Sequence, residues 1–369
     1  MASEKIKIGF IGAGGIARSH AFAISALPFY YEDAPEVSLE SVCSQSVLSR
    51  SAFASRYGFR GHSSLDEFTN NENINTIYIL GPNVVHVPHL EKALEMKNVS
   101  RIYIEKPVCA SKEEENIIEG MTLAYPRVRF QTGFQYLFNS SFRSALKQWR
   151  SGIFGRPLHF EVRYYHGDYL RKGYRDKRKT RLAPAPEGGA MADLGSHAMS
   201  LVVAFLNENL RIAGAIQAGS FGDVVPETDL FSSVFLTDPV TGAAGTVSAS
   251  RISSGTGDTL SMDIYGEKGS LRFSSNTPDY YEYYLEDSGT LNRVMTGSNY
   301  NPVTSFPSGH VPPGWLRSMI HAHYVFLIDN ANELLVPDLQ HGLAVQRLVR
   351  ESAEHMETFR NQYGITRNS

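Results

Sequence analysis

The sequence has few cysteines, and this limits the kinds of site that it can build. Only Cys43 and Cys109 occur among its 369 residues, so a disulfide framework is excluded, and no CxxC pair suggests zinc. His86 and His89 are close in the sequence, but no acidic or thiol residue accompanies them, so we expect no metal site. Such sparing use of cysteine is typical of a reducing compartment.

Long hydrophobic runs and an excess of one charge are also missing. The most apolar run, Met199–Leu206, is too short to span a bilayer, and the polar segment Met1–Lys7 lacks the apolar core of a signal peptide. The 35 Lys and Arg residues nearly balance the 38 Asp and Glu residues, which gives a net charge of −3. Because no strong field favours nucleic acid or an anionic membrane, we expect neither as a partner, and we expect a cytoplasmic location.

The length and the order of the apolar runs predict two domains. A chain of 369 residues exceeds what one core usually takes, and we place the boundary between residues 1–137 and 138–369. In the first third, helical patterns alternate with short apolar runs. These runs are Ile6–Ile11, Ser38–Cys43, Thr76–Leu80, Arg101–Ile104 and Val128–Gly133. Strands that alternate with helices favour a doubly wound parallel sheet, so we predict an α/β Rossmann domain.

After Phe138 the pattern changes to consecutive strands joined by turns. The predicted strands are Leu158–Tyr165, Ala213–Phe221, Phe231–Leu236, Gly245–Ser250, Leu260–Tyr265 and Ser270–Phe273. Strands without helices between them indicate a largely antiparallel sheet. Helices near Ala190–Leu206, Leu316–Asn330 and Asp338–Arg360 are expected to cover one face, which makes this an α+β domain with an open sheet. Since an open sheet face often pairs with a second subunit, we expect a homo-oligomer, either a dimer or a tetramer.

A glycine-rich turn follows the first predicted strand and opens a helix. The pattern G-x-G-x-x-G/A is matched by Gly12, Gly14, Gly15, Ile16 and Ala17. Gly12 permits the tight turn, Gly14 lets the backbone approach a pyrophosphate, and Ala17 lets helix and strand pack closely. The N–H groups at the start of the helix would bind the phosphates of a dinucleotide. The competing interpretation is a glycine-rich turn that holds no ligand.

The end of the second strand bears on the choice between NAD and NADP. A fold that prefers NAD usually carries an acidic residue there, but Val42–Ser46 contains none. Ser44 and Ser46 could donate hydrogen bonds to a 2′-phosphate and Arg50 could supply charge, so the sequence favours NADP over NAD. Alternatively, the serines only cap the following helix. The interval between Ala17 and Ser44 is longer than usual, and we interpret Pro28–Pro35 as the inserted loop that lengthens it.

Several short motifs occur in a fixed order along nearly the whole chain. After Gly12–Ala17 come Pro82-Asn83 with His86, Glu105-Lys106-Pro107, Gly133-Phe134, Arg181–Pro184, Gly188–Ala190, Asp193–His197 and Tyr265–Ser270. In this order they resemble the motifs of the Gfo/Idh/MocA oxidoreductases, a family named for glucose–fructose oxidoreductase and inositol dehydrogenase. Each motif is short, but their shared order makes the resemblance specific.

The resemblance implies roles for residues that follow strands of the first domain. Lys106 is implied as a catalytic acid/base, because hydride transfer at a carbinol carbon needs a paired proton transfer, which a lysine of lowered pKa can perform. Glu105 is implied to touch the nicotinamide ribose. Pro82, Asn83 and His86 are the implied contacts beside the nicotinamide. The competing interpretations are a surface Glu-Lys pair and a plain turn after a strand.

A second group of candidates lies in the second domain. Asp193 and His197 are four residues apart in a helical pattern, so they would share one face and the carboxylate could orient the imidazole. The resemblance implies His197 as the second acid/base and Asp193 as an orienting or substrate contact; the alternative is a helix N-terminal Asp beside a buried His. The resemblance implies Arg181 as a cofactor or substrate contact, and Tyr136 is predicted either to stack on a sugar substrate or only to pack in the core. Whether Lys106 or His197 is the main proton carrier stays open.

The resemblance implies an enzyme, an NAD(P)-dependent dehydrogenase or reductase that acts on CH–OH groups. It would transfer a hydride between nicotinamide and a hydroxyl-bearing carbon of a sugar, cyclitol or sugar derivative. Two other functions stay open on the same fold: an NAD-dependent glycosidase, and a non-catalytic cofactor-binding sensor or co-repressor. The presence of Lys106, Asp193 and His197 argues against the sensor, because such a protein can discard its acid/base residues.

Overall fold

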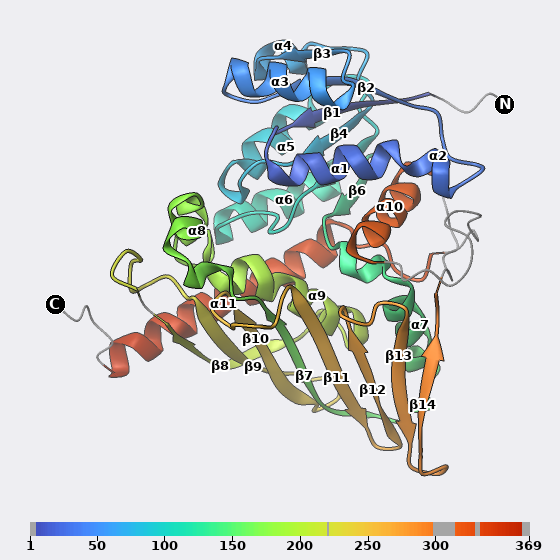
Figure 1. The fold of residues 1–369 in the computed structure, drawn as a ribbon, viewed down its shortest axis with the longest axis vertical. Helices are drawn as coiled ribbons and strands as arrows, with labels where there is room; N and C mark the ends of the chain where they lie inside the picture. The colour runs from blue at the N-terminus through green and yellow to red at the C-terminus, as the bar shows by residue number, and fades with distance from the viewer. Residues whose placement is uncertain (1–4, 220, 298–313, 329–332, 364–369) are drawn as a thin grey trace. The chain divides into compact units, whose positions relative to one another are not determined.

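The computed structural model describes residues 5–219, 221–297, 314–328 and 333–363, which form two compact units (Figure 1). Of these residues, the first unit comprises 5–109, 113–139, 314–328 and 333–340. The second unit comprises 110–112, 140–219, 221–297 and 341–363. The chain therefore leaves the first unit and returns to it late in the sequence.

The first unit is built on a six-stranded parallel sheet in the order β3-β2-β1-β4-β5-β6. Its strands are β1 (Ile6–Ile11), β2 (Val37–Cys43), β3 (Gly61–Ser63), β4 (Thr76–Ile79), β5 (Arg101–Ile104) and β6 (Arg129–Thr132). The central strands β1, β4 and β5 are almost wholly buried, as a parallel sheet covered on both faces requires. The predicted Rossmann fold is thereby confirmed. The sequence does not predict β3, because three residues carry too little pattern.

Helices connect the successive strands of this sheet. They are α1 (Gly15–Ser25), α2 (Leu27–Tyr30), α3 (Val47–Tyr57), α4 (Leu65–Thr69), α5 (His86–Leu94) and α6 (Lys112–Ala124), with the short helices η1 (Asn83–Val85) and η2 (Gln135–Phe138). The short α2 overlaps the segment predicted as an inserted loop, and Tyr31 directly after it is buried. The insertion is therefore packed into the core of the unit at this residue.

One more helix, α10 (Gly314–Leu327), belongs to the first unit, although the sequence predicts that it covers the antiparallel sheet. It packs against α1 and η2 (residues 329 and 330 of the predicted helix lie outside the described residues). Arg129 of β6 donates to the carbonyls of Val325 and Ile328, at 2.7 and 2.9 Å. Gln131 of the same strand donates to a carbonyl inside α10 at 3.1 Å. Polar contacts with the edge strand, which an apolar pattern does not reveal, thus join this helix to the first unit.

The second unit holds an eight-stranded sheet in the order β14-β13-β12-β11-β7-β10-β9-β8 (Figure 1). Its strands are β7 (Pro157–Tyr165), β8 (Arg211–Ala218), β9 (Phe231–Thr237), β10 (Ala244–Ser250), β11 (Thr259–Gly266), β12 (Gly269–Ser274), β13 (Tyr280–Leu285) and β14 (Thr290–Met295). The neighbours β7 and β10 pair in parallel and the other pairs are antiparallel, so the largely antiparallel sheet is confirmed. The sequence does not predict the edge hairpin of β13 and β14, because most of its side chains are at least partly exposed.

The second unit also contains several helices. They are α7 (Ser140–Arg150), α8 (Lys172–Asp176), α9 (Ser196–Phe205) and α11 (Leu339–Tyr363), with the short helices η3 (Asp168–Leu170), η4 (Lys179–Leu182) and η5 (Met191–Gly195). The helix α9 is buried along its length and packs against β7, β10 and β11, while α7 packs against β12 and β13. On β7, Phe160 and Val162 are buried, whereas the alternating His159, Glu161 and Arg163 are exposed. The apolar side chains of β7 therefore lie on the face against which α9 packs.

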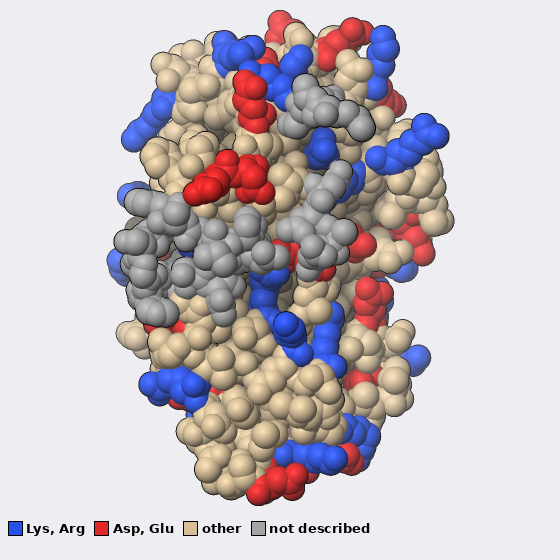
Figure 2. Space-filling view, turned by 90° about the vertical axis from the view of Figure 1, so that its right-hand side faces the viewer, with Lys and Arg blue, Asp and Glu red and all other residues tan. Residues whose placement is uncertain are grey.

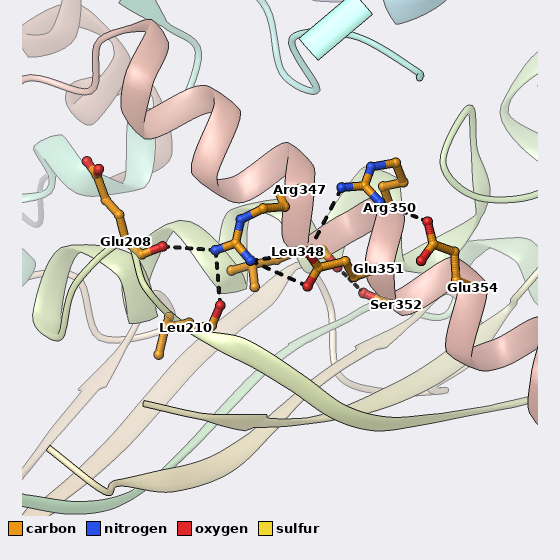
Figure 3. Close-up of polar contacts among 8 residues, drawn as sticks. All are labelled: Glu208, Leu210, Arg347, Leu348, Arg350, Glu351, Ser352 and Glu354. Atoms are coloured by element: carbon orange, nitrogen blue, oxygen red, sulfur yellow. Dashed lines mark hydrogen bonds and ion pairs between the residues drawn. The ribbon is translucent and has the colours of Figure 1, made fainter. Parts of the chain in front are cut away.

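A polar cluster ties α11 to the segment that precedes β8 (Figure 3). Arg347 donates from Nη2 to the carbonyls of Glu208 and Leu210, at 2.9 and 3.0 Å. Arg350 pairs with Glu354 at 2.8 Å, one turn further along the helix. The hydrogen bonds of Arg347 join two segments that lie far apart in the sequence, whereas the ion pair of Arg350 lies within one helix.

The surface carries charges of both signs. On the face drawn in Figure 2, Lys and Arg side chains are interspersed with Asp and Glu side chains. This agrees with the near balance of positive and negative residues in the sequence. None of the described helices combines the length and the apolar character that crossing a membrane demands.

Candidate active site

The glycine-rich turn joins β1 to α1. Gly12 has a φ of +123°, its N–H donates to the Cys43 carbonyl at 2.9 Å, and a Cβ on it would lie 2.9 Å from the Leu80 carbonyl carbon. Glycine is the residue that adopts this conformation and tolerates this close approach. The turn therefore lies between the carboxyl ends of β2 and β4, where ligands of open parallel sheets bind.

Open space lies beside the first turn of α1. A Cβ built on Gly14 or Gly15 would meet no atom of the described residues within 4 Å. Gly14 caps the helix without a side-chain hydrogen bond, and the first turn holds no acidic residue. Ile16 is partly exposed and Ala17 is fully buried. The N–H groups at this helix start thus have room for a pyrophosphate, and the residues fit a dinucleotide.

The end of β2 carries the residues predicted to select the cofactor. Ser46 caps α3 by accepting from the Ser49 N–H at 3.2 Å, and the Ser44 hydroxyl donates to the Ser46 carbonyl at 3.3 Å. The capping interpretation therefore holds for Ser46. Arg50 Nη1 donates to the Ser44 carbonyl at 2.8 Å, which holds the guanidinium beside the strand end. Burial raises the pKa of the Cys43 thiol to about 12, so this thiol is protonated at neutral pH.

The turn after β4 holds three of the predicted cofactor contacts. Pro82 precedes η1, and Asn83 begins it, with its side-chain amide donating to the Cys109 carbonyl at 3.3 Å. His86 is fully buried, and its Nε2 donates to the Gly81 carbonyl at 2.9 Å. Burial lowers the pKa of His86, so the imidazole is neutral and its hydrogen bond shapes the turn.

Glu105 and Lys106 follow β5 directly. Glu105 is buried, and its Oε1 accepts a hydrogen bond from His20 Nε2 at 2.9 Å. Its Oε2 accepts from the backbone N–H of Lys106 at 3.2 Å, and Lys106 itself is half-buried. A Cβ on Gly133, which follows β6, would lie 2.7 Å from Glu105 Oε1. The glycine therefore makes room for the carboxylate.

Two buried histidines near Glu105 are not among the residues predicted from the sequence. His20 Nδ1 lies 2.9 Å from His323 Nε2, and His323 Nδ1 lies 3.1 Å from the Tyr78 hydroxyl. The sequence offers one signal that could have identified His20. This residue lies one turn after Ala17, among the buried positions of α1. A histidine at such a position needs a buried polar partner, because burying it alone is costly.

In the second unit, Asp193 lies between two arginines. Its Oδ1 accepts from Arg181 Nη1 at 2.7 Å, and its Oδ2 accepts from Arg251 Nη2 at 2.9 Å. Arg251 is fully buried, lies 4.5 Å over the Tyr169 ring and donates to the Arg181 carbonyl at 2.6 Å. The structure thus brings the predicted Asp193 and Arg181 together. Arg251 escapes prediction, because a single arginine after a strand carries no pattern.

His197 lies in the first turn of α9 and is buried. The Ser200 hydroxyl donates to its carbonyl at 2.7 Å, and its ring centroid lies 5.9 Å from that of Tyr164. The segment is helical, as predicted, but Met191–Gly195 forms a π-helical turn. Asp193 therefore lies inside the π-helical turn, and His197 lies in the α-helix that follows it.

The predicted residues divide between the two units. The cofactor candidates lie in the first unit, after β1, β2, β4 and β5, and these strand ends meet at one edge of a parallel sheet. Lys106 and Tyr136 also belong to the first unit, where Tyr136 is buried in η2. Asp193, His197 and Arg181 belong to the second unit.

These features define a class of protein. A parallel sheet whose first turn has room for a pyrophosphate is the core of a dinucleotide-binding domain. Family models identify the chain further. One, the NAD-binding Rossmann fold of an oxidoreductase family, matches residues 6–120, and another, the GFO/IDH/MocA C-terminal domain, matches residues 142–272. The chain belongs to the GFO/IDH/MocA oxidoreductase family.

Three known proteins illustrate this similarity. The chain is 28% identical over 199 residues to glucose-6-phosphate 3-dehydrogenase of Bacillus subtilis, a match that covers 53% of the chain and only 52% of that relative. It is 23% identical over 304 residues to levoglucosan dehydrogenase of Pseudarthrobacter phenanthrenivorans, covering 75% of each. Its fold is similar to an inositol dehydrogenase homolog complexed with NAD+ from Azotobacter vinelandii, with a TM-score of 0.82, 18% identity and 96% of both chains covered.

Proposed function

We propose that this chain is an NAD(P)-dependent oxidoreductase that transfers a hydride between nicotinamide and a hydroxyl-bearing carbon of a sugar, cyclitol or sugar derivative. The observation that carries the proposal is the start of α1, where Gly14 and Gly15 leave room for a pyrophosphate. The family and the dehydrogenases among its relatives support the reaction. When bound, the cofactor supplies the group that accepts or donates the hydride.

Lys106 is the proposed acid/base at the substrate oxygen. It follows β5 directly, at the sheet edge where ligands of parallel sheets bind, and it is half-buried. Removing a hydride from a carbinol carbon requires that the hydroxyl lose its proton, which an amine can accept and return in the reverse direction. We assign His197 as the second acid/base and Asp193 as its orienting or substrate contact. Arg181 and Tyr136 are the proposed substrate contacts.

The proposed cofactor is NADP in preference to NAD. The end of β2 carries no acidic residue that would repel a 2′-phosphate, and Arg50 is held there by the Ser44 carbonyl. A guanidinium in this place pairs well with a phosphate group. Ser44 and Arg50 are the proposed contacts of this phosphate. The rest of the proposed cofactor site consists of Gly12, Gly14, Gly15, Ile16, Ala17, Pro82, Asn83, His86 and Glu105.

The relatives do not favour the two other functions considered from the sequence. Four curated relatives carry the names of sugar dehydrogenases and reductases. The proposal retains three further expectations from the sequence. These are a domain boundary after residue 137, a homo-oligomeric state and a cytoplasmic location.

The test is a fluorescence titration of the full chain with NADPH and with NADH. Absorbance of the reduced nicotinamide is then followed with a panel of sugars, sugar phosphates, anhydrosugars and inositols. We expect tighter binding of NADPH and a substrate-dependent change in absorbance. Arg50→Ala should weaken NADPH binding about tenfold and leave NADH binding within about twofold, because only the 2′-phosphate loses a charged partner. Binding of neither cofactor would refute the proposal, and cleavage of aryl glycosides without net absorbance change would favour the glycosidase.

A further inference from the structure

Four polar side chains in the core of the first unit form one chain of hydrogen bonds, which we call the relay (Tyr78, His323, His20 and Glu105). Glu105 Oε1 lies 2.9 Å from His20 Nε2. His20 Nδ1 lies 2.9 Å from His323 Nε2, and His323 Nδ1 lies 3.1 Å from the Tyr78 hydroxyl. The three ring-bearing residues are wholly buried, and Glu105 is 6% exposed. The members come from β4, α10, α1 and the end of β5, so the relay links four separate elements.

The chemistry of the groups sets the direction of each hydrogen bond in the relay. The carboxylate of Glu105 can only accept, so His20 Nε2 donates to it. In the tautomer of His20 whose single proton lies on Nε2, Nδ1 accepts from His323 Nε2, and a neutral His323 then accepts at Nδ1 from the Tyr78 hydroxyl. Burial lowers the pKa of His323 well below its usual value and raises the pKa of Tyr78 well above its own. Both therefore stay neutral, and all the ring nitrogens have partners.

Aromatic packing holds the relay in place. The Tyr78 ring stacks on the Tyr103 ring, with centroids 5.0 Å apart and an interplanar angle of 22°. The Tyr103 ring also meets the His20 ring edge-on at 5.1 Å and lies 5.3 Å from the His323 ring. The two imidazoles therefore cannot turn without displacing buried neighbours.

The relay ends at a carboxylate on the ligand-binding edge of the sheet. Replacing a buried ion pair by well-packed apolar side chains is often neutral or stabilising, so a buried polar cluster is weak evidence for a role in stability. His20 fixes Glu105 Oε1, and the Lys106 N–H donates to Oε2. Because a carboxylate oxygen has two acceptor positions, Oε2 keeps one for a hydroxyl of a bound ligand. The orientation of this oxygen depends on side chains that lie deep in the core.

We propose that His20 and His323 are positioning residues, which hold Glu105 in the orientation in which it binds the dinucleotide cofactor. The inference rests on the proposed function, since it requires that the first unit bind NAD(P). Tyr78 completes the arrangement by donating to His323 Nδ1, so that the His323 ring keeps its proton on the nitrogen that faces His20.

The test compares variants of the full chain by fluorescence titration with NADPH and NADH and by melting temperature. We expect His323→Leu to weaken cofactor binding about tenfold, because His20 loses its donor and Glu105 loses its fixed orientation. His323→Gln should bind within about threefold of wild type, because its amide donates toward His20 and accepts from Tyr78. Tyr78→Phe, which keeps the ring and removes one hydroxyl, should weaken binding about threefold.

His321→Leu is the matched control. His321 lies two residues earlier on α10, is equally buried, and its Nδ1 bonds the Tyr31 hydroxyl at 2.8 Å, outside the relay. We expect this variant to lose as much melting temperature as His323→Leu while its cofactor affinity stays within about twofold of wild type.

The outcomes separate the two claims. Unchanged cofactor binding in both His323→Leu and Tyr78→Phe would overturn the positioning role and leave the proposed function intact. Equal losses of affinity in His323→Leu and His321→Leu would reduce the relay to a core-stabilising cluster. A wild-type chain that binds neither cofactor would overturn the proposed function, and the inference with it.

Discussion

Lys106 is the side chain on which the proposed proton transfer depends. Lys106→Ala should lower kcat by about 10²–10⁴-fold, as expected when a general acid/base is removed, while NADPH affinity stays within about twofold. Steady-state kinetics and fluorescence titration measure the two quantities separately. Lys97→Ala is the control, because Lys97 is exposed and pairs only loosely, at 3.8 Å, with Glu72. Normal turnover in the Lys106 variant would remove this residue from the assignment.

The two arginines that bind Asp193 differ in burial and should differ in their contribution to stability. The Arg251 side chain is 0% exposed and that of Arg181 is 48% exposed. Arg251→Met should lower the free energy of unfolding by about 3 kcal/mol, because a partly buried carboxylate loses its desolvated partner. Arg181→Met should cost about 1 kcal/mol or less, because solvent screens an exposed pair. Urea unfolding measures both, and equal losses would contradict the dependence on burial.

The parts of the site that sequence reasoning identified are those with a local cause. Gly12 is predictable because its φ of +123°, a conformation that favours glycine, belongs to a turn of a few residues. The contact between His20 and His323 joins residues 303 positions apart, and the packing of α10 on α1 creates it. No short pattern encodes such a pair, so only the folded chain reveals it.

At the scale of elements, Arg347 and Arg350 test what anchors α11. Arg347→Ala should lower the free energy of unfolding by about 2 kcal/mol, because two backbone carbonyls outside the helix lose a charged donor. Arg350→Ala should cost less, because its ion pair with Glu354 lies within one helix, where such a pair contributes about 0.5 kcal/mol. Urea unfolding of both variants is the measurement. A larger loss from Arg350→Ala would show that α11 is held elsewhere.

The same helix gives a dependence of stability on pH. Burial lowers the pKa of His341 from 6.5 to about 4, so between these values the unfolded chain binds a proton that the folded chain does not. The stabilisation is therefore present above pH 6.5 and is lost as the pH falls toward 4, by about 3 kcal/mol in all. His341→Gln should flatten this part of the profile. Urea unfolding across this range checks it, and an unchanged slope would exclude His341 as the cause.

Elements were predictable from the sequence where both their faces are buried or where polar and apolar residues alternate. The strands β1, β4 and β5 are short, mostly apolar runs, and β7 alternates buried and exposed side chains. The hairpin of β13 and β14 lies at the sheet edge with mostly half-exposed side chains, so neither pattern marks it. The sequence predicts α10 as a helix, but polar contacts with β6 decide its partner.

At the scale of the whole molecule, cofactor binding and folding should be coupled through the turn at α1. At a cofactor concentration about 100 times the Kd, the free energy of unfolding should rise by about 2.7 kcal/mol. Gly14→Asp should abolish this gain, because a carboxylate in the open space repels a pyrophosphate. The variant should fold without loss, since Asp is a favourable helix cap and a Cβ here meets no neighbour. Thermal unfolding with and without NADPH is the measurement, and an undiminished shift in the variant would place the phosphates elsewhere.

The chain returns to the first unit through α10 after it has built the eight-stranded sheet. A fragment that ends at residue 139 would therefore contain all six parallel strands and still lack the carbonyls that bind Arg129 and Gln131. It would also lack His323, the partner of His20. The first unit is encoded by two separated stretches of the gene, so recombination between related genes keeps this unit intact only if both stretches are exchanged together. A single crossover near residue 139 would instead combine the parallel sheet of one protein with the α10 of another.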